Sequence, residues 1–407
     1  MAGRSSPGGT GMERKQLDTN FFDPAYMEDP FPLYEEIRAV GNCVWNDLLS
    51  GWVVVGYDEG MSVLTDAGER FAILSGDPEL TFWFEAPNMI TVDGPVHRRL
   101  RSALAPLFTR NEVTKWEPRI SEVVHELLAP LVAGSDSFDL IADFTTLPTL
   151  IVSEMLGVPE ERYDDFQRWS HDIVTNLAFG MEDPESLAVL RRAATEINAY
   201  LREEIERHRR EQPDDLLTTM LNMSGEHAMS TEEIQSTAVL LLAAGYDTTA
   251  KTMSNCLIAL DRNPEQRRHI AADLSLVPAA IEESLRWFGP VQWLPRRAVQ
   301  DAVLDGMEVA AGENVFVFDA AANRDPRRWP HPEQFDVFRE SKAHMAFGSG
   351  PHLCLGAPLA RLETRIAIEE LLRLAPEFHL RDLDFGKSMF VRGPERGVVD
   401  VGVRATP

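Results

Sequence analysis

One cysteine in a glycine-rich stretch constrains this chain more than any other feature. Residues 347–356 read FGSGPHLCLG, and the three glycines permit tight turns and a close approach of the backbone to a flat ligand. Apolar residues follow at Leu359, Leu362 and Ile366, the spacing of one helical face. Because the N-terminus of a helix stabilises a nearby thiolate, the pattern predicts that Cys354 ligates a metal. The alternative is that it is a small buried apolar residue.

A second unusual stretch lies inside the longest predicted helix, from Met229 to about Arg262. A Ser230-x-x-Glu233 capping box predicts its start. The sequence AAGYDTT at residues 243–249 interrupts its apolar part with Gly, Asp and Thr, all poor helix formers. Such a lapse in a buried helix indicates a functional site, and a threonine hydroxyl can bond to a carbonyl one turn back and open the helix. The alternative is a surface-facing Asp beside two ordinary threonines.

A third stretch places basic residues at the start of a predicted helix, directly after Asp93-Gly94-Pro95. His97 and Arg101 are four residues apart and therefore share one helical face. Positive charges at a helix start oppose the helix dipole, so these two residues need another reason to be there. A solvated face is the alternative, and it suits Arg98 and Arg99.

Composition limits the classes of protein that the chain can belong to. The 407 residues are 44% hydrophobic, which is enough for a large core. The net charge is 39 − 65 = −26, which argues against nucleic acid or an anionic membrane as a general partner. The three cysteines are far apart in sequence and suggest no disulfide framework, so a reducing cytoplasm is expected. The first residues lack an apolar run, and residues 1–17 are predicted to be a disordered tail before a single domain at 18–407.

Shorter patterns predict further elements. A continuous run of β-branched residues at 52–55 predicts a buried strand, and hairpin-like turns are expected at 305–306 and 311–312. Between residues 115 and 227 the patterns are helical and carry no chemical motif.

Together the motifs resemble those of the cytochrome P-450 family. Residues 347–356 match F-G-x-G-x-H-x-C-x-G at every fixed position, and residues 243–249 match A/G-G-x-D/E-T-T/S. The family's H-x-x-x-R segment corresponds to 97–101 and its E-x-x-R segment to 283–286. The resemblance covers the chain from about Phe21. It implies a mainly α fold with small β-sheets, a single domain with the haem between the long oxygen-side helix and the helix after the cysteine loop.

The resemblance also implies roles for particular residues. Cys354 would be the axial thiolate of a haem b. The other haem contacts would be His97, Arg101, Ala244, Gly245, Arg296, Phe347, Gly348, His352 and Gly356. Asp247 and Thr248 would be the acid–alcohol pair that delivers protons to bound dioxygen, the co-substrate. Glu283 and Arg286 would be a buried structural pair. Gln334 replaces the usual arginine that is the third member of this network, so the charge of the network is left open.

The substrate cavity is expected to be apolar and aromatic-walled. The predicted lining residues are Phe82, Trp83, Phe84, Ala243, Val291, Trp293, Leu294 and Phe390. For the aromatic residues at 82–84, covering a core is an equally good interpretation. Such a cavity suits a terpenoid, a steroid-like ring system or a substituted aromatic.

By this resemblance the reaction is oxygen insertion into a C–H bond of a small-to-medium apolar substrate. A haem-thiolate gas sensor or electron carrier is one alternative, but it would have no use for Asp247 and Thr248. A peroxide-driven oxygenase is the other, and it commonly lacks this pair. Membrane-bound members begin with an anchor that is missing here, so a soluble bacterial-type member, expected to be a monomer, is predicted.

Electrons are expected from a separate protein, because the chain has no flavin or nicotinamide fingerprint. The family's soluble donors are acidic ferredoxins, which a NAD(P)H-dependent reductase reduces. A basic docking patch is predicted on the cysteine side of the domain, formed by Arg98, Arg99, Arg110, Arg361 and Arg365. The alternative is that these arginines pair with Glu363, Glu369 and Glu370 and attract no partner.

Overall fold

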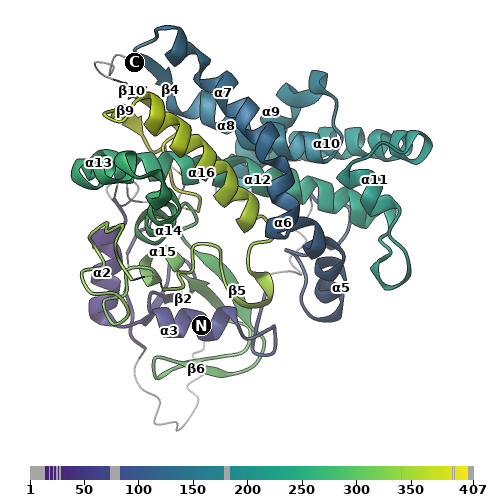
Figure 1. The fold of residues 1–407 in the computed structure, drawn as a ribbon. Helices are drawn as coiled ribbons and strands as arrows, with labels where there is room; N and C mark the ends of the chain where they lie inside the picture. Colours follow the sequence, from purple (N-terminus) through teal and green to yellow (C-terminus); the bar gives the residue numbers. More distant parts are fainter. Residues whose placement is uncertain are drawn as a thin grey trace.

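The computed structural model is a mainly helical domain, and several of its helices pack against one long helix, α12. It describes residues 14–401 except 18, 22, 24–25, 27–28, 74–82, 178–183, 341, 387 and 389. The first helices are α2 (Phe31–Val40), α3 (Tyr57–Leu64), α5 (Gly94–Leu104), α6 (Arg110–Val113), α7 (Glu117–Ala133), α8 (Leu140–Met155) and α9 (Tyr163–Leu177). The later ones are α10 (Pro184–Glu211), α11 (Leu216–Leu221), α12 (Thr231–Arg262), α13 (Pro264–Ala272), α14 (Val277–Phe288), α15 (Asp319–Ala322) and α16 (Ala357–Leu374). Figure 1 shows α16 crossing in front of α12, with most of the sheet structure below them.

Three small sheets complete the domain and confirm the mainly α class. The largest has the order β1-β2-β8-β5-β3. Its strands are β1 (Cys43–Asn46), β2 (Gly51–Val54), β3 (Phe71–Ala72), β5 (Leu294–Ala298) and β8 (Asn314–Val317). A second sheet has β10 (Arg396–Asp400) between β4 (Ser137–Asp139) and β9 (His379–Asp384), and β6 (Ala302–Leu304) pairs with β7 (Met307–Val309).

The strand and turn predictions meet different outcomes. The buried strand predicted at 52–55 is β2. The turn at Asp305-Gly306 joins β6 and β7 as expected, with both residues at positive φ. The turn at 311–312 is not a hairpin, because β8 pairs with β2 and β5 instead of returning along β7.

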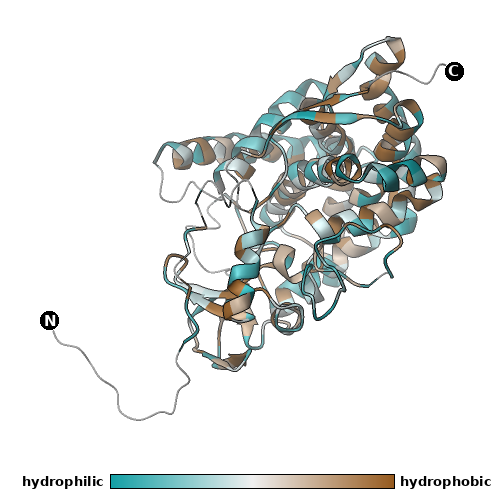
Figure 2. Ribbon diagram, turned by 90° about the vertical axis from the view of Figure 1, so that its left-hand side faces the viewer, coloured by the Kyte–Doolittle hydropathy of each residue, from teal (hydrophilic) through white to brown (hydrophobic). Residues whose placement is uncertain are grey.

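The long helix begins where the capping box predicts. Ser230 accepts a hydrogen bond from the Glu233 amide, and the Glu233 carboxylate accepts one from the Ser230 amide. Almost every residue between Ile234 and Leu260 is buried, so α12 is an internal rod rather than an amphipathic surface helix. Figure 2 shows hydrophilic and hydrophobic residues mixed along the outer helices, as expected for helices with one exposed face. Among the described residues, no helix is long and apolar enough to cross a membrane.

The predicted disordered tail is wrong for residues 14–17. Arg14 forms an ion pair with Glu313 at 2.5 Å, and Lys15 forms one with Asp305 at 2.9 Å. Gln16 forms a β-bridge with Trp45, so this segment lies along β1. The ion-pair partners of Arg14 and Lys15 are about 300 positions away in the sequence, so no local pattern could predict them. Residues 1–13 lie outside the described part of the chain.

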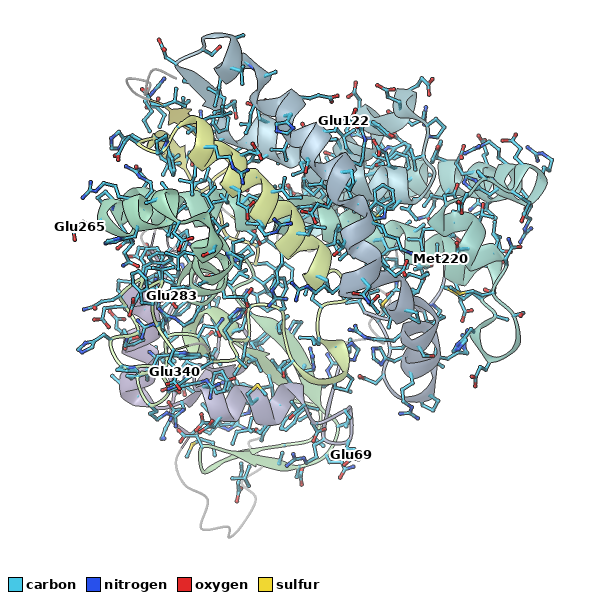
Figure 3. The ribbon with its side chains drawn as sticks, in the orientation of Figure 1. Glu69, Glu122, Met220, Glu265, Glu283 and Glu340 are labelled. Atoms are coloured by element: carbon cyan, nitrogen blue, oxygen red, sulfur yellow. The ribbon has the colours of Figure 1, made fainter. Side chains whose placement is uncertain are left out.

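The E-x-x-R pair is buried and belongs to a larger network. Glu283, labelled in Figure 3, accepts hydrogen bonds from Arg286 at 2.7 Å and from Arg339 at 3.0 Å. Both arginines also donate to the backbone carbonyl of Gln334, whose side chain takes no part in these bonds. Arg339, five residues further along the chain, therefore supplies the second guanidinium group of the network. It gives the network the positive charge that Gln334, in place of the usual arginine, cannot give.

We predict that Arg339→Leu destabilises the protein more than Gln334→Ala does. Arg339→Leu removes one of the two guanidinium groups that donate to Glu283, and losing a hydrogen bond between charged groups costs about 1.5–3 kcal/mol of the free energy of unfolding. The Gln334 side chain is exposed, and its carbonyl remains in the alanine variant, so that change should be nearly neutral. Urea denaturation of the two variants measures the difference. Equal midpoints would contradict a supporting role for Arg339.

Candidate functional site

The loop before α16 holds Cys354 in one orientation. The Cys354 amide donates a hydrogen bond to the carbonyl of Phe347 at 2.8 Å, which closes the loop. Gly350 has φ of 67°, and a Cβ there would lie 2.4 Å from the carbonyl oxygen of Leu64 in α3. Only glycine allows the loop to approach α3 so closely. Helix α16 then starts at Ala357, three residues after the cysteine, as the apolar spacing predicts.

Cys354 is the exposed cysteine of the three, whereas Cys43 and Cys256 are buried. Part of the Cys354 side chain is accessible, but many protein atoms surround it. The resulting desolvation raises the pKa of its thiol, because a thiolate is poorly solvated inside a protein. The backbone N–H groups of Gly356 and Ala357 and the charge of Arg101 act in the opposite direction. The start of α16 therefore lowers the pKa of Cys354, as predicted, but by less than desolvation raises it. A bound metal cation would supply the missing stabilisation of the thiolate.

Basic side chains from several segments gather beside the cysteine loop. Arg101 lies close enough to Cys354 to interact electrostatically with it, and His97 stacks on His352 with ring centroids 4.2 Å apart. His352 Nε2 is hydrogen-bonded to Asp93 Oδ1 at 2.7 Å. The negative charge of Asp93 in turn stabilises the charged form of Arg296. The structure thus brings together residues from α5, β5 and the cysteine loop that are separated by up to about 260 positions.

Within the described part of the chain, the two arginines of this cluster, Arg101 and Arg296, form no ion pair. Arg296 is 5% exposed, forms no ion pair in the described part of the chain, and donates only to the carbonyl of Pro295. Burial lowers the pKa of Arg296 to about 10, and it lowers the pKa of His97 to about 4. His97 Nε2 is buried without a hydrogen-bond partner. Buried cations are normally paired and buried ring nitrogens are normally hydrogen-bonded, so Arg296 and His97 fit a ligand that brings its own carboxylates, as a haem does with its propionates.

The long helix presents a small open face at the AAGYDTT motif. Between Ile234 and Leu260, the residues that are not buried are Leu241, Ala244, Gly245, Asp247 and Thr248. Four of them have the 3,4,7 spacing of a single helical face. Thr248 Oγ1 donates to the carbonyl of Ala244 at 2.7 Å, the bond one turn back that the sequence suggests. The helix is nevertheless continuous from Thr231 to Arg262, so the expected local opening is absent at this motif.

Asp247 does not face bulk solvent, so the alternative of a surface aspartate is wrong. Its carboxylate forms an ion pair with Lys251 at 2.9 Å, and Lys251 also pairs with Glu395 at 2.8 Å. Burial raises the pKa of Asp247 despite the nearby ammonium group. The sequence analysis missed Lys251, although a lysine one turn after Asp247 in an apolar helix was a visible signal. Glu395 had no local signal.

The predicted pocket residues fall into two groups. Trp293 and Phe390 are in contact with ring centroids 5.0 Å apart, and Val291 bridges to Val391, so the two predicted wall segments do lie together. Leu294 lies beside the cysteine loop, 3.6 Å from where a Cβ of Gly348 would be. The other group belongs to the main core. Its members are Trp83, which is 7% exposed, the partly buried Phe84 stacked on Trp83, and the buried Ala243. Phe82 lies outside the described residues.

The predicted basic docking patch is largely neutralised. Arg361 pairs with Glu282 at 2.6 Å, Arg365 pairs with Glu117 at 2.7 Å, and Arg99 pairs with Glu233. In the described part of the chain, Arg98 and Arg110 are exposed and form no ion pair. The alternative of pairing therefore holds for three of the five arginines. The partners differ in part from those expected, since Glu363 is buried and burial raises its pKa to about 8.

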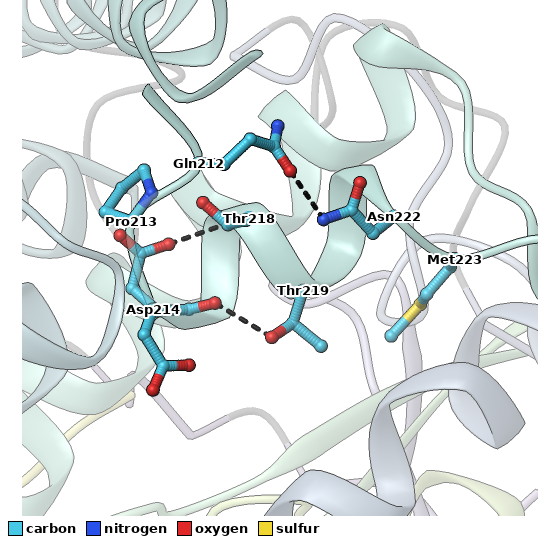
Figure 4. Close-up of a pocket in the computed structure, with 8 residues that line it drawn as sticks. Gln212, Pro213, Asp214, Thr218, Thr219, Asn222 and Met223 are labelled. Atoms are coloured by element: carbon cyan, nitrogen blue, oxygen red, sulfur yellow. Dashed lines mark hydrogen bonds between the residues drawn. The ribbon is translucent and has the colours of Figure 1, made fainter. Parts of the chain in front are cut away.

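A surface cavity elsewhere in the described structure has no cysteine or basic side chain in its lining, unlike the region of Cys354. It has a volume of about 530 Å³ and lies between the end of α10 and α11. As Figure 4 shows, its polar groups bond to one another, for example Gln212 to Asn222 at 2.8 Å and Asp215 to the Thr218 amide. These bonds cap α11 and stabilise the loop before it. They leave no group arranged for catalysis.

The loop that carries the Cys354 thiol, the unpaired arginines beside it and the polar stretch of the buried helix α12 fit a haem-thiolate site. The family model for cytochrome P450 matches residues 52–374, and the chain belongs to the cytochrome P450 family. It is therefore a monooxygenase that uses a haem-thiolate cofactor and dioxygen, and it is related to bacterial hydroxylases.

Three similar proteins span nearly the whole chain. The cytochrome P450 monooxygenase PikC of Streptomyces venezuelae is 35% identical, over 98% of this chain and 97% of that protein. The vitamin D(3) 25-hydroxylase of Pseudonocardia autotrophica is 34% identical, over 97% and 98% of the two chains. The crystal structure of CYP109E1 from Bacillus megaterium in complex with testosterone has a TM-score of 0.85 at 31% identity, and the match covers 93% of this chain and 99% of that one.

We predict that Arg296→Met weakens haem binding without weakening the haem-free fold. A hydrogen bond between charged groups contributes about 1.5–3 kcal/mol, so haem affinity should fall at least about tenfold. The haem-free protein should be no less stable, because the variant removes a buried unpaired cation. Arg297→Met is the matched control, since Arg297 is the exposed neighbour on the opposite face of β5. Haem titration and urea denaturation measure both effects. Equal haem affinities for the two variants would contradict this role.

Proposed function

We propose that this cytochrome P450 hydroxylates a steroid-like apolar substrate, with haem b as cofactor and an acidic ferredoxin as electron donor. The observation that carries the proposal is the group of cations without carboxylate partners beside the exposed thiol of Cys354. The names of two similar proteins support the substrate class, because one hydroxylates vitamin D(3) and another binds testosterone. The wall formed by Trp293 and Phe390 supports it further, because rigid aromatic side chains suit a flat, apolar ring system.

The proposed haem contacts come from four segments. Cys354 would ligate the iron, while His97, Arg101, Arg296 and His352 would bind the propionates as charge-assisted partners. Phe347, Gly348 and Gly356 would lie against one face of the ring, and Ala244 and Gly245 against the other. Side chains larger than those of Ala244 and Gly245 would narrow the open face of α12. When bound, the haem supplies oxygen activation and hydroxylation of the C–H bond.

The proposed catalytic residues are Thr248 on that open face and Asp247 next to it. The hydroxyl of Thr248 uses its hydrogen in the bond to Ala244, so its lone pairs can accept a hydrogen bond from a group in the adjacent space. Asp247, one residue earlier, has a raised pKa and can hold a proton at a higher pH than an exposed carboxyl could. Together they would bring protons to the oxygen side while the surrounding core excludes water.

The proposed electron donor would find few unpaired basic residues to dock against on this protein. Arg98 and Arg110 are the candidates that remain from the predicted basic patch. Both belong to the segment formed by α5 and α6, and α6 packs against α16, the helix that follows Cys354. An acidic ferredoxin would be steered by these charges, although more weakly than by five unpaired arginines.

We predict that Thr248→Ala separates electron consumption from product formation. With testosterone as the probe substrate and a surrogate ferredoxin and reductase, the wild type should form hydroxylated steroid. In the variant, NADPH oxidation should continue, whereas product per NADPH should fall about tenfold or more and hydrogen peroxide should be released. Chromatography of steroid products and a peroxide assay measure the ratio. Full coupling in the variant would contradict the role of Thr248, and no steroid oxidation by the wild type would contradict the substrate class.

A further inference from the structure

A buried lysine in the middle of α12 is held between two carboxylates. The side chain of Lys251 is 5% exposed, and its Nζ lies 2.9 Å from Asp247 Oδ2 and 2.8 Å from Glu395 Oε1. A third bond goes to the carbonyl of Val391 at 3.3 Å. The lysine stem passes directly over Gly393, where a Cβ would lie only 2.6 Å from Lys251 Cγ. Glycine at this position makes room for the lysine.

The three side chains form a path whose two ends are more exposed than its middle. Asp247, beside Thr248, is 14% exposed at its side chain, Lys251 is 5% exposed, and Glu395 is 33% exposed. The two ends therefore differ in their environment. One lies next to the open face of α12, and the other reaches solvent just before β10. Lys251 contacts both ends.

The charges of this cluster favour proton uptake. Two carboxylates share one ammonium group, so the trio carries a net charge of −1 in a poorly solvated place. Burial raises the pKa of Asp247, and its two carboxylate neighbours raise the pKa of Lys251 against the effect of burial. Two other titratable groups face Asp247, namely His171 from α9 and the adjacent Tyr246. Asp247 forms no ion pair with either of them.

We propose that Glu395, Lys251 and Asp247 form a proton relay that carries protons from solvent to the oxygen side of the site. Glu395 takes up a proton at the surface. Lys251 passes one of its Nζ protons to Asp247 and receives the proton of Glu395 in the same step, so Lys251 remains an ammonium group and the net charge of the trio is unchanged. Asp247 then gives its proton to the site beside Thr248. This inference rests on the proposed function, since it extends the proton delivery assigned there to Asp247.

A structural latch is the alternative role for Lys251, because the segment 390–395 must be held against α12. The chain offers a matched control for it. Asn255, one turn after Lys251, donates to the carbonyls of Phe288 and Arg392 at 3.0 Å each and so ties the same segment to α12 without a titratable group. Asn255→Ala should loosen this attachment and leave proton transfer unchanged. Glu395→Gln has the opposite character, because its amide oxygen can still accept the Lys251 hydrogen bond but cannot carry a proton.

The first experiment measures the pKa of Asp247 itself. Carboxyl-labelled aspartate is followed by NMR in the diamagnetic reduced protein with carbon monoxide, and Asp247→Asn assigns the signal. Glu395→Gln should lower this pKa, because Lys251 then serves one carboxylate instead of two, whereas Lys251→Met should raise it. Asn255→Ala should leave it unchanged. If the pKa of Asp247 does not change in Glu395→Gln, the coupling on which the relay depends is overturned. This result counts even if Lys251→Met does not fold.

The second experiment measures proton delivery during turnover. In Glu395→Gln, product per NADPH should fall about tenfold, less than the about 10²-fold that a positioned proton donor itself contributes, and the solvent deuterium isotope effect on product formation should rise. Asn255→Ala should keep the wild-type isotope effect. Wild-type coupling and isotope effect in Glu395→Gln would overturn the relay, provided that the wild type itself hydroxylates the probe substrate. Failure of that wild-type reaction would instead contradict the proposed function, so the two failures are distinguishable.

Discussion

The structure depends on a helix that is buried along almost its whole length. A rod of 32 residues inside the domain requires packing partners on every side, and α8, α9, α10, α14 and α16 supply them. Its backbone satisfies itself, so only side chains can place polar chemistry in the interior. The stretch that is not fully buried contains Ala244, Gly245, Asp247 and Thr248. The poor helix formers in this stretch are tolerated because the surrounding packing, and not local propensity, holds the helix.

The second requirement is that a cationic cluster be kept without counter-ions until a ligand provides them. Most arginines in the described part of the chain are paired, even in the E-x-x-R network, where Arg339 and Arg286 share Glu283. Against that background, Arg296 in β5 is a buried guanidinium that forms no ion pair in the described part of the chain. A cation of this kind costs stability in the protein without ligand, and that cost is recovered when an anion binds. The same reasoning explains why the thiol of Cys354 needs a metal to become a stable thiolate.

Local patterns in the sequence predicted what depends on neighbouring residues. The start of α12, the start of α16, strand β2 and the turn between β6 and β7 follow from spacing, capping residues and glycines. Contacts between distant residues were not predictable in this way. Arg339 replacing the function of Gln334, and the ion pairs of Arg361 and Arg365, depend on tertiary packing that no local pattern encodes. The family motifs located the candidate site, whereas the Lys251–Glu395 pair became visible only in three dimensions.

The central claim is that Cys354 ligates the haem iron, and one spectrum tests it most directly. The reduced protein with carbon monoxide should show the far-red-shifted Soret band of thiolate ligation. This band should disappear in Cys354→Ser and persist in Cys256→Ser, whose thiol is buried in the core with its pKa raised to about 12. A wild-type band at the position typical of histidine ligation, or an unchanged band in Cys354→Ser, would contradict the account.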